Sequence, residues 1–313
     1  MSGHAQLASE VIDISSWNPD DRFPAYPEGT REKSLWISPQ SPPLPFLIGG
    51  HRYLFKHASR RHPAQFWCEV IAYRLGCLMG ISVPPAYAAW KSKSNESAAL
   101  IEWFYRRDDK NVRYEPGTVH MKRLIPNFDV KKGCQHNILT VLKILSEIDA
   151  GLIPDMARIL VFDALIGNTD RHQGNWGILW RGTPPRPELA PAFDNGTSLG
   201  HEILDDKIVS FVSDPAQTKR YIEKGQHHMR WNQTEDKKCG HFDLIKWLLN
   251  QYPGLRQNLF GCLAFDMDVL NTWMRVLPNF PVPVVPTLER IQWIECLLRV
   301  RIERLRAVLT SRD

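Results

Sequence analysis

Three polar side chains that can carry acid–base or metal chemistry lie close together in one segment: Asp170, His172 and Asn175. The segment lies between two apolar runs, and a further carboxylate, Asp194, follows downstream. A positioned carboxylate can act as a general base, and carboxylate and amide oxygens are ligands that Mg²⁺ prefers. These residue types therefore predict a centre that combines a base with a bound cation.

The segments on either side of these residues predict how they meet. WGILW (176–180) and ELAPAF (188–193) have the pattern of two strands of a hairpin, joined by a proline-rich turn. Because a hairpin brings its open ends together, Asn175 and Asp194 should lie opposite one another, with about 5 Å between backbones. We expect both to bind one magnesium ion, whose other positions go to water and substrate phosphates.

Asp170 and Asn175 have the spacing D-x-x-x-x-N, which the kinase catalytic loop uses for its catalytic Asp and metal-binding Asn. Asp170 is therefore predicted to accept or orient the proton of an attacking hydroxyl. We assign His172 a supporting catalytic role, because a loop histidine can hydrogen-bond the backbone and shape the loop. Asp and Asn also favour ordinary turns, so the hypothesis depends on the whole set of residues.

A strand and a helix further upstream supply a second pair of charged residues. Residues 51–56 (HRYLFK) have strand character and deliver Lys56 at the strand end, and residues 64–79 have the period of an amphipathic helix that carries Glu69. A strand lysine paired with a helix glutamate is the arrangement with which protein kinases hold nucleotide phosphates. The alternative for Glu69 alone is a solvated helix residue.

A glycine-containing loop precedes both elements. Gly29 permits close approach of the backbone to a ligand, and Arg31 and Lys33 add positive charge, as a loop that covers phosphates requires. Alone, the same residues would also suit a surface turn.

The order of predicted elements indicates an α+β, bilobal fold. Strands are expected at 11–17, 51–56, 86–90 and 97–104, and the composition changes abruptly after Phe104. We place the boundary there, with residues 1–104 as a small β-rich N-lobe and 105–313 as a larger helical C-lobe. Helices are predicted in the C-lobe at 137–148, 155–166, with Asp155 as N-cap, 243–251, 255–266, 268–275 and 288–309.

Composition excludes several classes of protein. With 313 residues and 43% hydrophobic content the chain can bury a large core, and its net charge of +5 gives no strong nucleic-acid signal. The six cysteines form no CxxC, which favours a reducing compartment. The N-terminus lacks the pattern of a signal peptide, and the strongest apolar run, ILVFDALI, contains Asp163, so no membrane span is predicted. We expect a cytoplasmic protein, with delivery into a host cell as an open alternative.

A rival cluster of metal-capable side chains has the spacing HH-x10-C-x-H and comprises His227, His228, Cys239 and His241. This spacing matches none of the usual zinc arrangements. Exposed loop histidines are the better explanation.

Four segments of the chain resemble the HipA-like serine/threonine kinases, which are related in fold to protein and phosphoinositide kinases. GTREKS (29–34) resembles the phosphate loop of that family, and YLFK, ending at Lys56, resembles its nucleotide-lysine strand. ALIEWF (99–104) resembles the hinge between the lobes, and GNTDRHQGNWG with APAFD resembles the catalytic and metal loops.

The resemblance implies ATP and Mg²⁺ as cofactors and a protein substrate with a Ser or Thr acceptor. It implies roles for a set of residues: nucleotide binding by Gly29, Thr30, Arg31, Lys33, Lys56 and Glu69, adenine contact by Glu102 and Phe104, base catalysis by Asp170, and magnesium binding by Asn175 and Asp194. Two other hypotheses stay open, a kinase acting on small molecules or phosphoinositides and a nucleotide-binding pseudokinase that serves as an interaction module.

Two features of the family do not carry over from the sequence. Toxin-type members have an extra N-terminal subdomain, whereas only a short segment precedes Gly29 here, so an antitoxin partner is left open. Toxin members can also phosphorylate a serine just before that glycine. Residues 22–28 contain no Ser or Thr, and the nearest hydroxyls of these types are Thr30 and Ser34.

Overall fold

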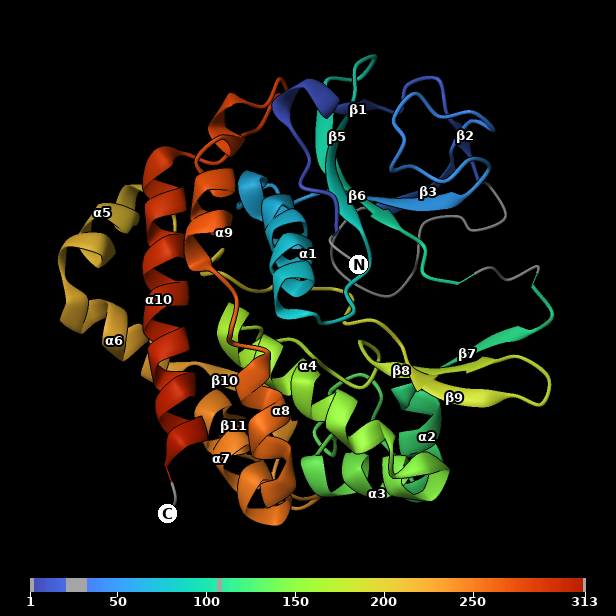
Figure 1. The fold of residues 1–313 in the computed structure, drawn as a ribbon, viewed down its shortest axis with the longest axis vertical. Coiled ribbons are helices and arrows are strands. Elements are labelled where there is room, and N and C mark those ends of the chain that lie inside the picture. Colours follow the sequence, from blue (N-terminus) through green and yellow to red (C-terminus); the bar gives the residue numbers. More distant parts are fainter. Residues whose placement is uncertain (1–2, 21–32, 106–108, 312–313) are drawn as a thin grey trace.

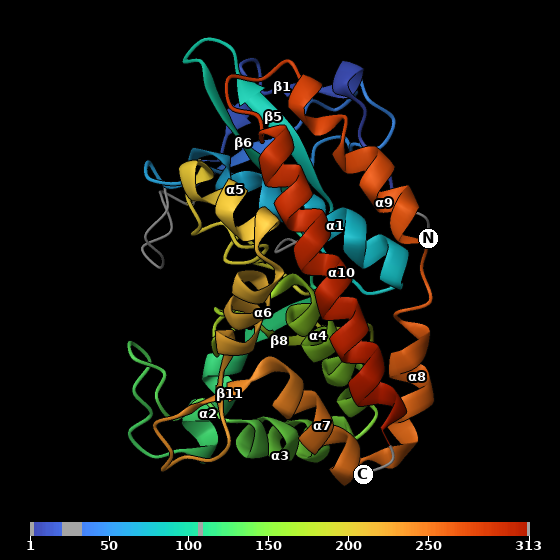
Figure 2. The same ribbon diagram turned by 90° about the vertical axis from the view of Figure 1, so that its left-hand side faces the viewer.

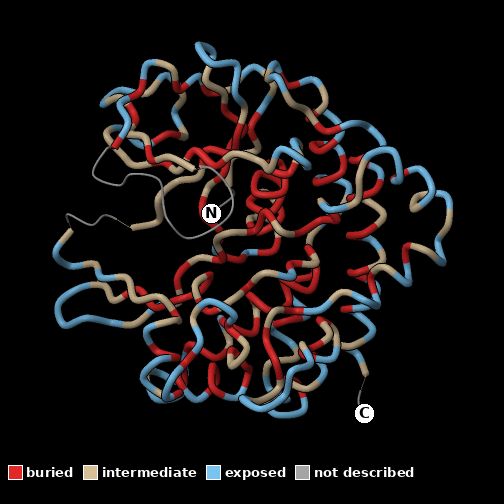
Figure 3. Tube along the Cα trace, turned by 180° about the vertical axis from the view of Figure 1, so that it is seen from behind, coloured by how far each residue is buried: buried red, intermediate tan, exposed pale blue. Residues whose placement is uncertain are grey.

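The computed structural model describes residues 3–20, 33–105 and 109–311. Within these ranges a sheet and helix α1 (Trp67–Met79) occupy one end of the molecule, and most of the helices occupy the other (Figures 1 and 2). The long C-terminal helix α10 (Leu288–Thr310) runs beside both parts. Buried residues are concentrated in the interior of both parts (Figure 3).

In the described ranges, six strands form the large sheet in the order β1-β5-β6-β4-β3-β2. Only the β1–β5 pair is parallel, and the other pairs are antiparallel. The strands are β1 (Ile12–Asp13), β2 (Asn18–Pro19), β3 (Lys33–Ile37), β4 (Arg52–Lys56), β5 (Ala86–Lys91) and β6 (Glu96–Glu102). The strand expected at 11–17 is therefore much shorter than predicted.

Helix α1 packs on this sheet and follows a short 3-10 helix, η2 (Pro63–Phe66). Helix α1 is present as predicted, but it is not amphipathic: ten of its 13 residues are buried, among them Glu69, Val70 and Leu75, so it is buried on nearly all sides and not along one face. Gly80 ends the helix in the left-handed conformation, with φ of 65°, as expected for a glycine C-cap.

A smaller three-stranded sheet lies beside the helical part. Its strands are β7 (Val112–Pro116), β8 (Gly177–Arg181) and β9 (Arg186–Leu189), in the order β7-β8-β9. The helices nearest to it in sequence are α2 (Gly117–Leu124), α3 (Ile138–Asp149) and α4 (Leu152–Ile166). Strand β7 and helix α2 were not predicted, because their residues follow directly on a polar stretch.

Several of the remaining elements, four helices among them, pack against helix α10. The remaining elements are η1 (Ala8–Glu10), α5 (Asp205–Ser213), α6 (Pro215–Lys224), β10 (Gln226–Arg230), β11 (Lys238–Gly240), α7 (His241–Gln251), η3 (Pro253–Leu255), α8 (Arg256–Gly261), α9 (Met267–Met274) and η4 (Leu277–Asn279). None of the helices in the described ranges is both long and apolar enough to cross a membrane.

The predicted N-cap of α4 and the predicted end of α8 are wrong. Helix α4 begins at Leu152, so Asp155 lies in its first turn and is not the N-cap; Pro154 is tolerated there because the first helical N–H groups have no partner within the helix. The helix expected at 255–266 ends at Gly261. Asn137, expected as the first residue of the helix at 137–148, is the N-cap of α3, and its side chain accepts the backbone N–H of Thr140 at 2.9 Å.

Segments from the two ends of the chain pack together on α1. The indole N–H of Trp67 donates to the carbonyl of Val284 at 3.1 Å, and that of Trp273 donates to the carbonyl of Gln6 at 2.9 Å. C-terminal residues therefore contribute to the end of the molecule that holds the large sheet. The division of the chain at residue 104 stays a prediction.

Candidate active site

Lys56 joins three segments that are far apart in the sequence. It is the last residue of β4 and only 4% exposed. Its Nζ lies 2.5 Å from Oε1 of Glu69 on α1 and 2.6 Å from Oδ1 of Asp194. The predicted pair of strand lysine and helix glutamate is thus in contact. Asp194, the carboxylate expected to bind magnesium, forms an ion pair with the same ammonium group.

Glu69 also holds the loop that carries Asp194. Its two carboxylate oxygens accept the backbone N–H groups of Asn195 and Gly196, each at 2.9 Å. Asp194 has a φ of 59°, a left-handed conformation that is uncommon for residues other than glycine. Hydrogen bonds to an ionised carboxylate are among the stronger ones in proteins. Glu69 therefore holds two groups in place, the ammonium group of Lys56 and the turn at Asp194.

A buried ion pair that was not predicted from the sequence lies next to the loop of residues 168–175. Arg171 and Asp163 both have side chains that are 0% exposed, and Nη2 of Arg171 lies 2.7 Å from Oδ1 of Asp163. Nε of Arg171 donates to Oδ2 at 3.0 Å, so the contact is bidentate. Burial alone would raise the pKa of Asp163, but the Arg171 cation and the hydrogen bonds from His227 and Arg171 outweigh it and lower that pKa to about 2.

The remaining donors of Arg171 connect the two loops of the site. Nη1 donates to the carbonyl of Asn175 at 3.2 Å and to the carbonyl of Phe193. Nη2 donates to Oδ1 of Asn195 at 2.7 Å. One guanidinium group therefore fixes the backbone next to both predicted magnesium ligands, Asn175 and Asp194.

The predicted hairpin is present, but its second strand differs from the expected one. Strand β9 covers Arg186–Leu189, opposite β8, and not residues 188–193. Pro191 has no N–H to donate to a ladder, and the N–H of Ala192 donates to the carbonyl of Ser82 at 2.8 Å. The prediction that Asn175 and Asp194 lie directly opposite one another in the hairpin is therefore wrong. Hydrogen bonds from Arg171, and not strand pairing, connect the backbone at Asn175 with the backbone at Phe193, next to Asp194.

The loop of residues 168–175, which holds the predicted base Asp170, is shaped by its own polar groups. Asn168 accepts the N–H of Asp170 at 2.9 Å, and Nδ2 of Asn175 donates to the carbonyl of Asp170 at 2.8 Å. Nδ1 of His172 accepts the N–H of Gly174 at 2.9 Å. Because the amide nitrogen of Asn175 is bonded inside the loop, its Oδ1 is the atom suited to a cation.

The predicted metal position offers oxygen ligands of the kind that magnesium prefers. Asn175 offers an amide oxygen and Asp194 a carboxylate, which are hard ligands that Mg²⁺ accepts. Among the described residues no cluster of three or more His, Cys, Asp or Glu side chains is arranged to hold a metal. A set of two protein oxygens fits a magnesium ion that keeps water and phosphate ligands, and it does not fit a structural zinc site.

Histidine rings line the side of the 168–175 loop that carries His172. His172 and His228 have ring centroids 5.9 Å apart, and Nδ1 of His228 lies 3.3 Å from Nδ1 of His136. The indole N–H of Trp176 donates to Nε2 of His136 at 3.1 Å. In its neutral form His136 therefore carries its proton on Nδ1 and donates it to His228. Burial, followed by neighbouring positive groups, lowers the pKa of both rings, that of His228 to about 3, which keeps them neutral at neutral pH.

Aromatic residues gather where the resemblance places the adenine ring. Phe104 stacks on Phe193 with centroids 5.2 Å apart and meets Tyr114 edge-on at 5.5 Å. Glu102 is paired with Tyr53 across β6 and β4, and loss of hydration raises its pKa to about 7. The sequence analysis did not predict that Phe193 and Tyr114 lie here. For Phe193, its position next to Asp194 was the one available signal, and Tyr114 had none.

The predicted phosphate loop is only partly described. Gly29, Thr30 and Arg31 lie outside the described residues, whereas Lys33 is the first residue of β3. Lys33 is directly opposite Lys56 in the antiparallel β3–β4 pair. Residues opposed in this way project from the same face of a sheet, so Lys33 shares the face of Lys56.

A family model described as the HipA-like C-terminal domain matches residues 28–251. The chain belongs to this family. The matched segment contains each residue that the sequence assigned to the site, from Gly29 to Asp194. Family membership thus agrees with the resemblance found in the four sequence segments.

One curated relative of this HipA-like chain is a serine/threonine-protein kinase, CtkA, from Helicobacter pylori (strain J99). The two are 31% identical over 114 residues, which is 32% of this chain and 33% of the relative. The match therefore spans about a third of the curated relative.

Solved structures show the fold of the HipA-like chain. A Helicobacter pylori proinflammatory kinase, CtkA, has a TM-score of 0.75 and 17% identity, and the alignment covers 96% of this chain and 98% of that one. HipA from the Shewanella oneidensis MR-1 complex with HipB and operator DNA has a TM-score of 0.55 and 14% identity, with coverage of 95% and 71%. The fold is α+β and protein-kinase-like, with a small β-rich lobe and a larger helical lobe, as predicted.

Proposed function

We propose that this chain is a HipA-like serine/threonine protein kinase that transfers the γ-phosphoryl group of ATP to a hydroxyl group of a protein substrate. The observation that carries the proposal is the position of Lys56 between Glu69 and Asp194, at 2.5 Å and 2.6 Å. A buried lysine held by a helix glutamate is the arrangement by which protein kinases contact nucleotide phosphates. The printed name of the curated relative, a serine/threonine-protein kinase, supports the same acceptor class.

The roles of the phosphate-binding residues follow from charge and position. Lys56 would offset negative charge on the ATP phosphates, and Lys33 would add a second ammonium group from the same face of the sheet. Glu69 would keep Lys56 oriented while it anchors Asn195 and Gly196. The loop residues Gly29, Thr30 and Arg31 would cover the phosphates, and Glu102 and Phe104 would border the adenine.

The roles of the catalytic loop follow from its oxygen atoms. Asp170 would accept the proton of the substrate hydroxyl, and Asn175 and Asp194 would hold Mg²⁺. Magnesium, when bound, supplies charge stabilisation for the transferred phosphoryl group. His172 would keep the loop in shape through its bond to the N–H of Gly174.

The setting of the enzyme is part of the same proposal. All six cysteines are free thiols, which supports a cytoplasmic, reducing location. We also keep residues 1–104 and 105–313 as the two lobes. No antitoxin partner is part of the proposal.

The test is phosphoryl transfer from radiolabelled ATP with the wild type, Asp170→Asn and a matched control, Asp206→Asn, whose residue is exposed on α5. Protein substrates and phosphoinositide vesicles are offered separately, and MgADP binding is measured by calorimetry. We expect transfer to Ser or Thr of protein, reduced about 100-fold or more by Asp170→Asn, with nucleotide binding retained.

Each alternative gives a different result in this experiment. Transfer to phosphoinositide alone would indicate a lipid or small-molecule kinase. Nucleotide binding without transfer to any substrate, and without autophosphorylation, would indicate a pseudokinase. Equal activity of the wild type and Asp170→Asn would remove Asp170 from the catalytic role.

A further inference from the structure

The chain that follows Asp194, the predicted magnesium ligand, leads to the first residue of helix α5 as the segment 194–205, which the structure describes in full. In protein kinases the segment after the magnesium-binding aspartate is the activation loop, and a phosphate group that pairs with arginine often orders it. The segment here is held by hydrogen bonds to α1, α4 and α10. Its order therefore comes from contacts that the unmodified chain supplies.

The first half of this segment is fixed against α1 and α4. Sγ of Cys68 donates to the carbonyl of Ser198 at 3.5 Å, and the N–H of Leu199 donates to the carbonyl of Ile166 at 2.7 Å. Leu199 and Gly200 then form a turn in which both residues are left-handed, with φ of 55° and 66°. A leucine in this conformation is rare and persists only where its surroundings hold it. The turn therefore depends on contacts from outside the segment.

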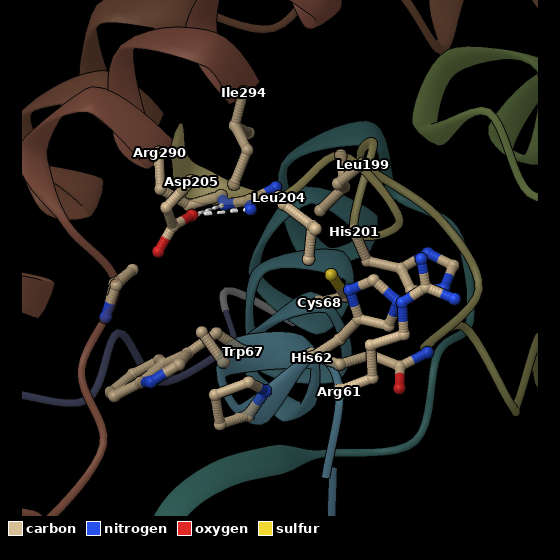
Figure 4. Close-up of a pocket in the computed structure, with 14 residues that line it drawn as sticks. Arg61, His62, Trp67, Cys68, Leu199, His201, Leu204, Asp205, Arg290 and Ile294 are labelled. Atoms are coloured by element: carbon tan, nitrogen blue, oxygen red, sulfur yellow. Dashed lines mark hydrogen bonds and ion pairs between the residues drawn. The ribbon is translucent and has the colours of Figure 1, made fainter. Parts of the chain in front are cut away.

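Arg290 of helix α10 holds the second half of the segment. Its Nη1 donates to the carbonyl of Gly200 at 3.0 Å, and its Nη2 donates to the carbonyl of Ile203. Nε and Nη2 both donate to Oδ1 of Asp205, at 3.0 Å and 2.6 Å (Figure 4). The side chain of Arg290 is only 11% exposed. If the turn opened, donors in a mostly buried place would lose their acceptors, which is costly.

The pair of Asp205 with Arg290 has the chemistry of an arginine–phosphate pair, because each joins a guanidinium group to an anionic oxygen. The carboxylate belongs to the chain and is present without any modification. The pocket beside this pair has a volume of about 70 Å³, which is small for an organic ligand. Arg290 is thus balanced by Asp205 and needs no bound anion.

The hydroxyl groups of the segment are poorly placed to accept a phosphate. Between residues 194 and 205 the sequence has two residues of the Ser, Thr or Tyr type, Thr197 and Ser198. Ser198 is 2% exposed, and its Oγ donates to the carbonyl of Asn195 at 2.6 Å. Thr197 is half-buried, and its carbonyl accepts the N–H of Thr169 at 3.3 Å. Phosphorylation at either position would have to disturb contacts that already order the segment.

We propose that Arg290 is a positioning residue of the kinase, which keeps the segment 194–205, and with it the turn at Asp194, in the active geometry without phosphorylation of that segment. The proposal rests on the proposed function. Asp205 supplies the negative charge that a phosphate group supplies in kinases whose activation loop is phosphorylated. Arg290 lies outside residues 28–251, so the proposal extends the working site beyond the part of the chain that the family model matches.

The positioning role is tested on the full chain with Arg290→Gln and a matched control, Arg299→Gln, whose residue is exposed on the same helix. Hydrogen exchange read by mass spectrometry measures the order of the segment. We expect amide exchange at residues 198–204 to become about tenfold faster or more in Arg290→Gln, because glutamine cannot reach all three acceptors. Arg299→Gln should match the wild type within about twofold.

Steady-state kinetics separate a positioning role from a purely structural one. We expect Arg290→Gln to lower kcat about tenfold and to change KM for ATP less than about threefold, because Lys56 and Glu69 keep their contact. Arg290→Lys keeps the charge beside Asp205 and should recover part of the lost kcat. Faster exchange with an unchanged kcat, or exchange and kcat equal to those of Arg299→Gln, overturns the proposal.

A milder variant covers the case in which Arg290→Gln does not fold. Asp205→Asn removes only the anion, and we expect it to lower kcat about threefold, whereas Asp206→Asn next to it should have no effect. In the Arg290→Gln background, if that chain folds, Asp205→Asn should lower kcat no further, because the partner is already absent. Equal kcat for Asp205→Asn and Asp206→Asn overturns the role of the pair.

Independence from phosphorylation is tested with phosphatase-treated wild type, in which mass spectrometry shows residues 194–205 unmodified. We expect transfer to protein substrate that is linear from the first time point. A lag that ends as Thr197 or Ser198 becomes phosphorylated overturns the proposal. Absence of any transfer by the wild type removes the proposed function, and the exchange comparison then still decides whether Arg290 orders the segment.

Discussion

Arg171 donates two hydrogen bonds from neighbouring nitrogens to the carboxylate of Asp163 in a place where neither side chain is exposed to solvent. Moving two charges out of water is costly, and only good geometry with further hydrogen bonds offsets that cost. The further bonds are present: Asn168 donates to Asp163 at 3.1 Å, and Arg171 reaches Asn195 at 2.7 Å. The pair therefore ties helix α4 to both loops of the site.

Replacement of Arg171 tests this arrangement. Arg171→Met leaves the Asp163 carboxylate buried without its cation, so we expect the free energy of unfolding to fall by about 3–5 kcal/mol. The measurement is urea denaturation followed by circular dichroism. Arg186→Met, at an exposed position on β9, is the matched control and should change stability by less than about 0.5 kcal/mol. A loss below about 1 kcal/mol for Arg171→Met would show that Asp163 finds another partner.

Local patterns predicted much of the proposed site. Lys56 lies at the end of a strand and Glu69 in the first turn of a helix, and both elements have clear periods in the sequence. The spacing of Asp170 and Asn175 could be recognised because one short loop holds both. The sequence therefore supplied the candidate residues and the order of elements around them.

Contacts between distant segments could not be predicted in the same way. Asp163 stood out as a charge in an apolar run, and a buried carboxylate requires a cation, but nothing in the sequence singled out Arg171 from the other arginines. The stacking of Phe104 on Phe193 likewise depends on how the two parts of the molecule meet. The predicted length of β9 was wrong because the N–H of Ala192 donates to the carbonyl of Ser82, which lies in another part of the chain.

Glu102 predicts a pH dependence of stability. Its pKa rises from 4.5 to about 7 in the folded protein because of lost hydration, so between these values the folded state binds a proton that the unfolded state does not. Stability contributed by protonated Glu102 is thus present below pH 4.5 and is lost as the pH rises toward about 7. Relative to Glu102→Gln, the free energy of unfolding of the wild type should fall by about 1–2 kcal/mol over this pH window. The expected fall is smaller than the full pKa shift would give, because Glu102 is partly exposed.

The measurement is urea denaturation of the wild type and Glu102→Gln at several pH values. Glu96→Gln, at an exposed position of the same strand, serves as the control and should run parallel to the wild type. Parallel curves for the wild type and Glu102→Gln would contradict the raised pKa of Glu102.

Glu69 offers the sharpest kinetic prediction, because one carboxylate orients Lys56 and also accepts two backbone N–H groups. Glu69→Gln keeps the shape of the side chain but removes the charge and leaves one amide oxygen where two carboxylate oxygens were bonded. Lys56 and the turn at Asp194 should both lose their fixed positions, and we expect kcat/KM for ATP to fall about 100-fold. Steady-state kinetics compare this variant with Glu147→Gln, an exposed glutamate on α3. A rate equal to that of Glu147→Gln would mean that the contact of Lys56 with Asp194, at 2.6 Å, is sufficient to position the lysine, and that the contact with Glu69 serves the structure alone.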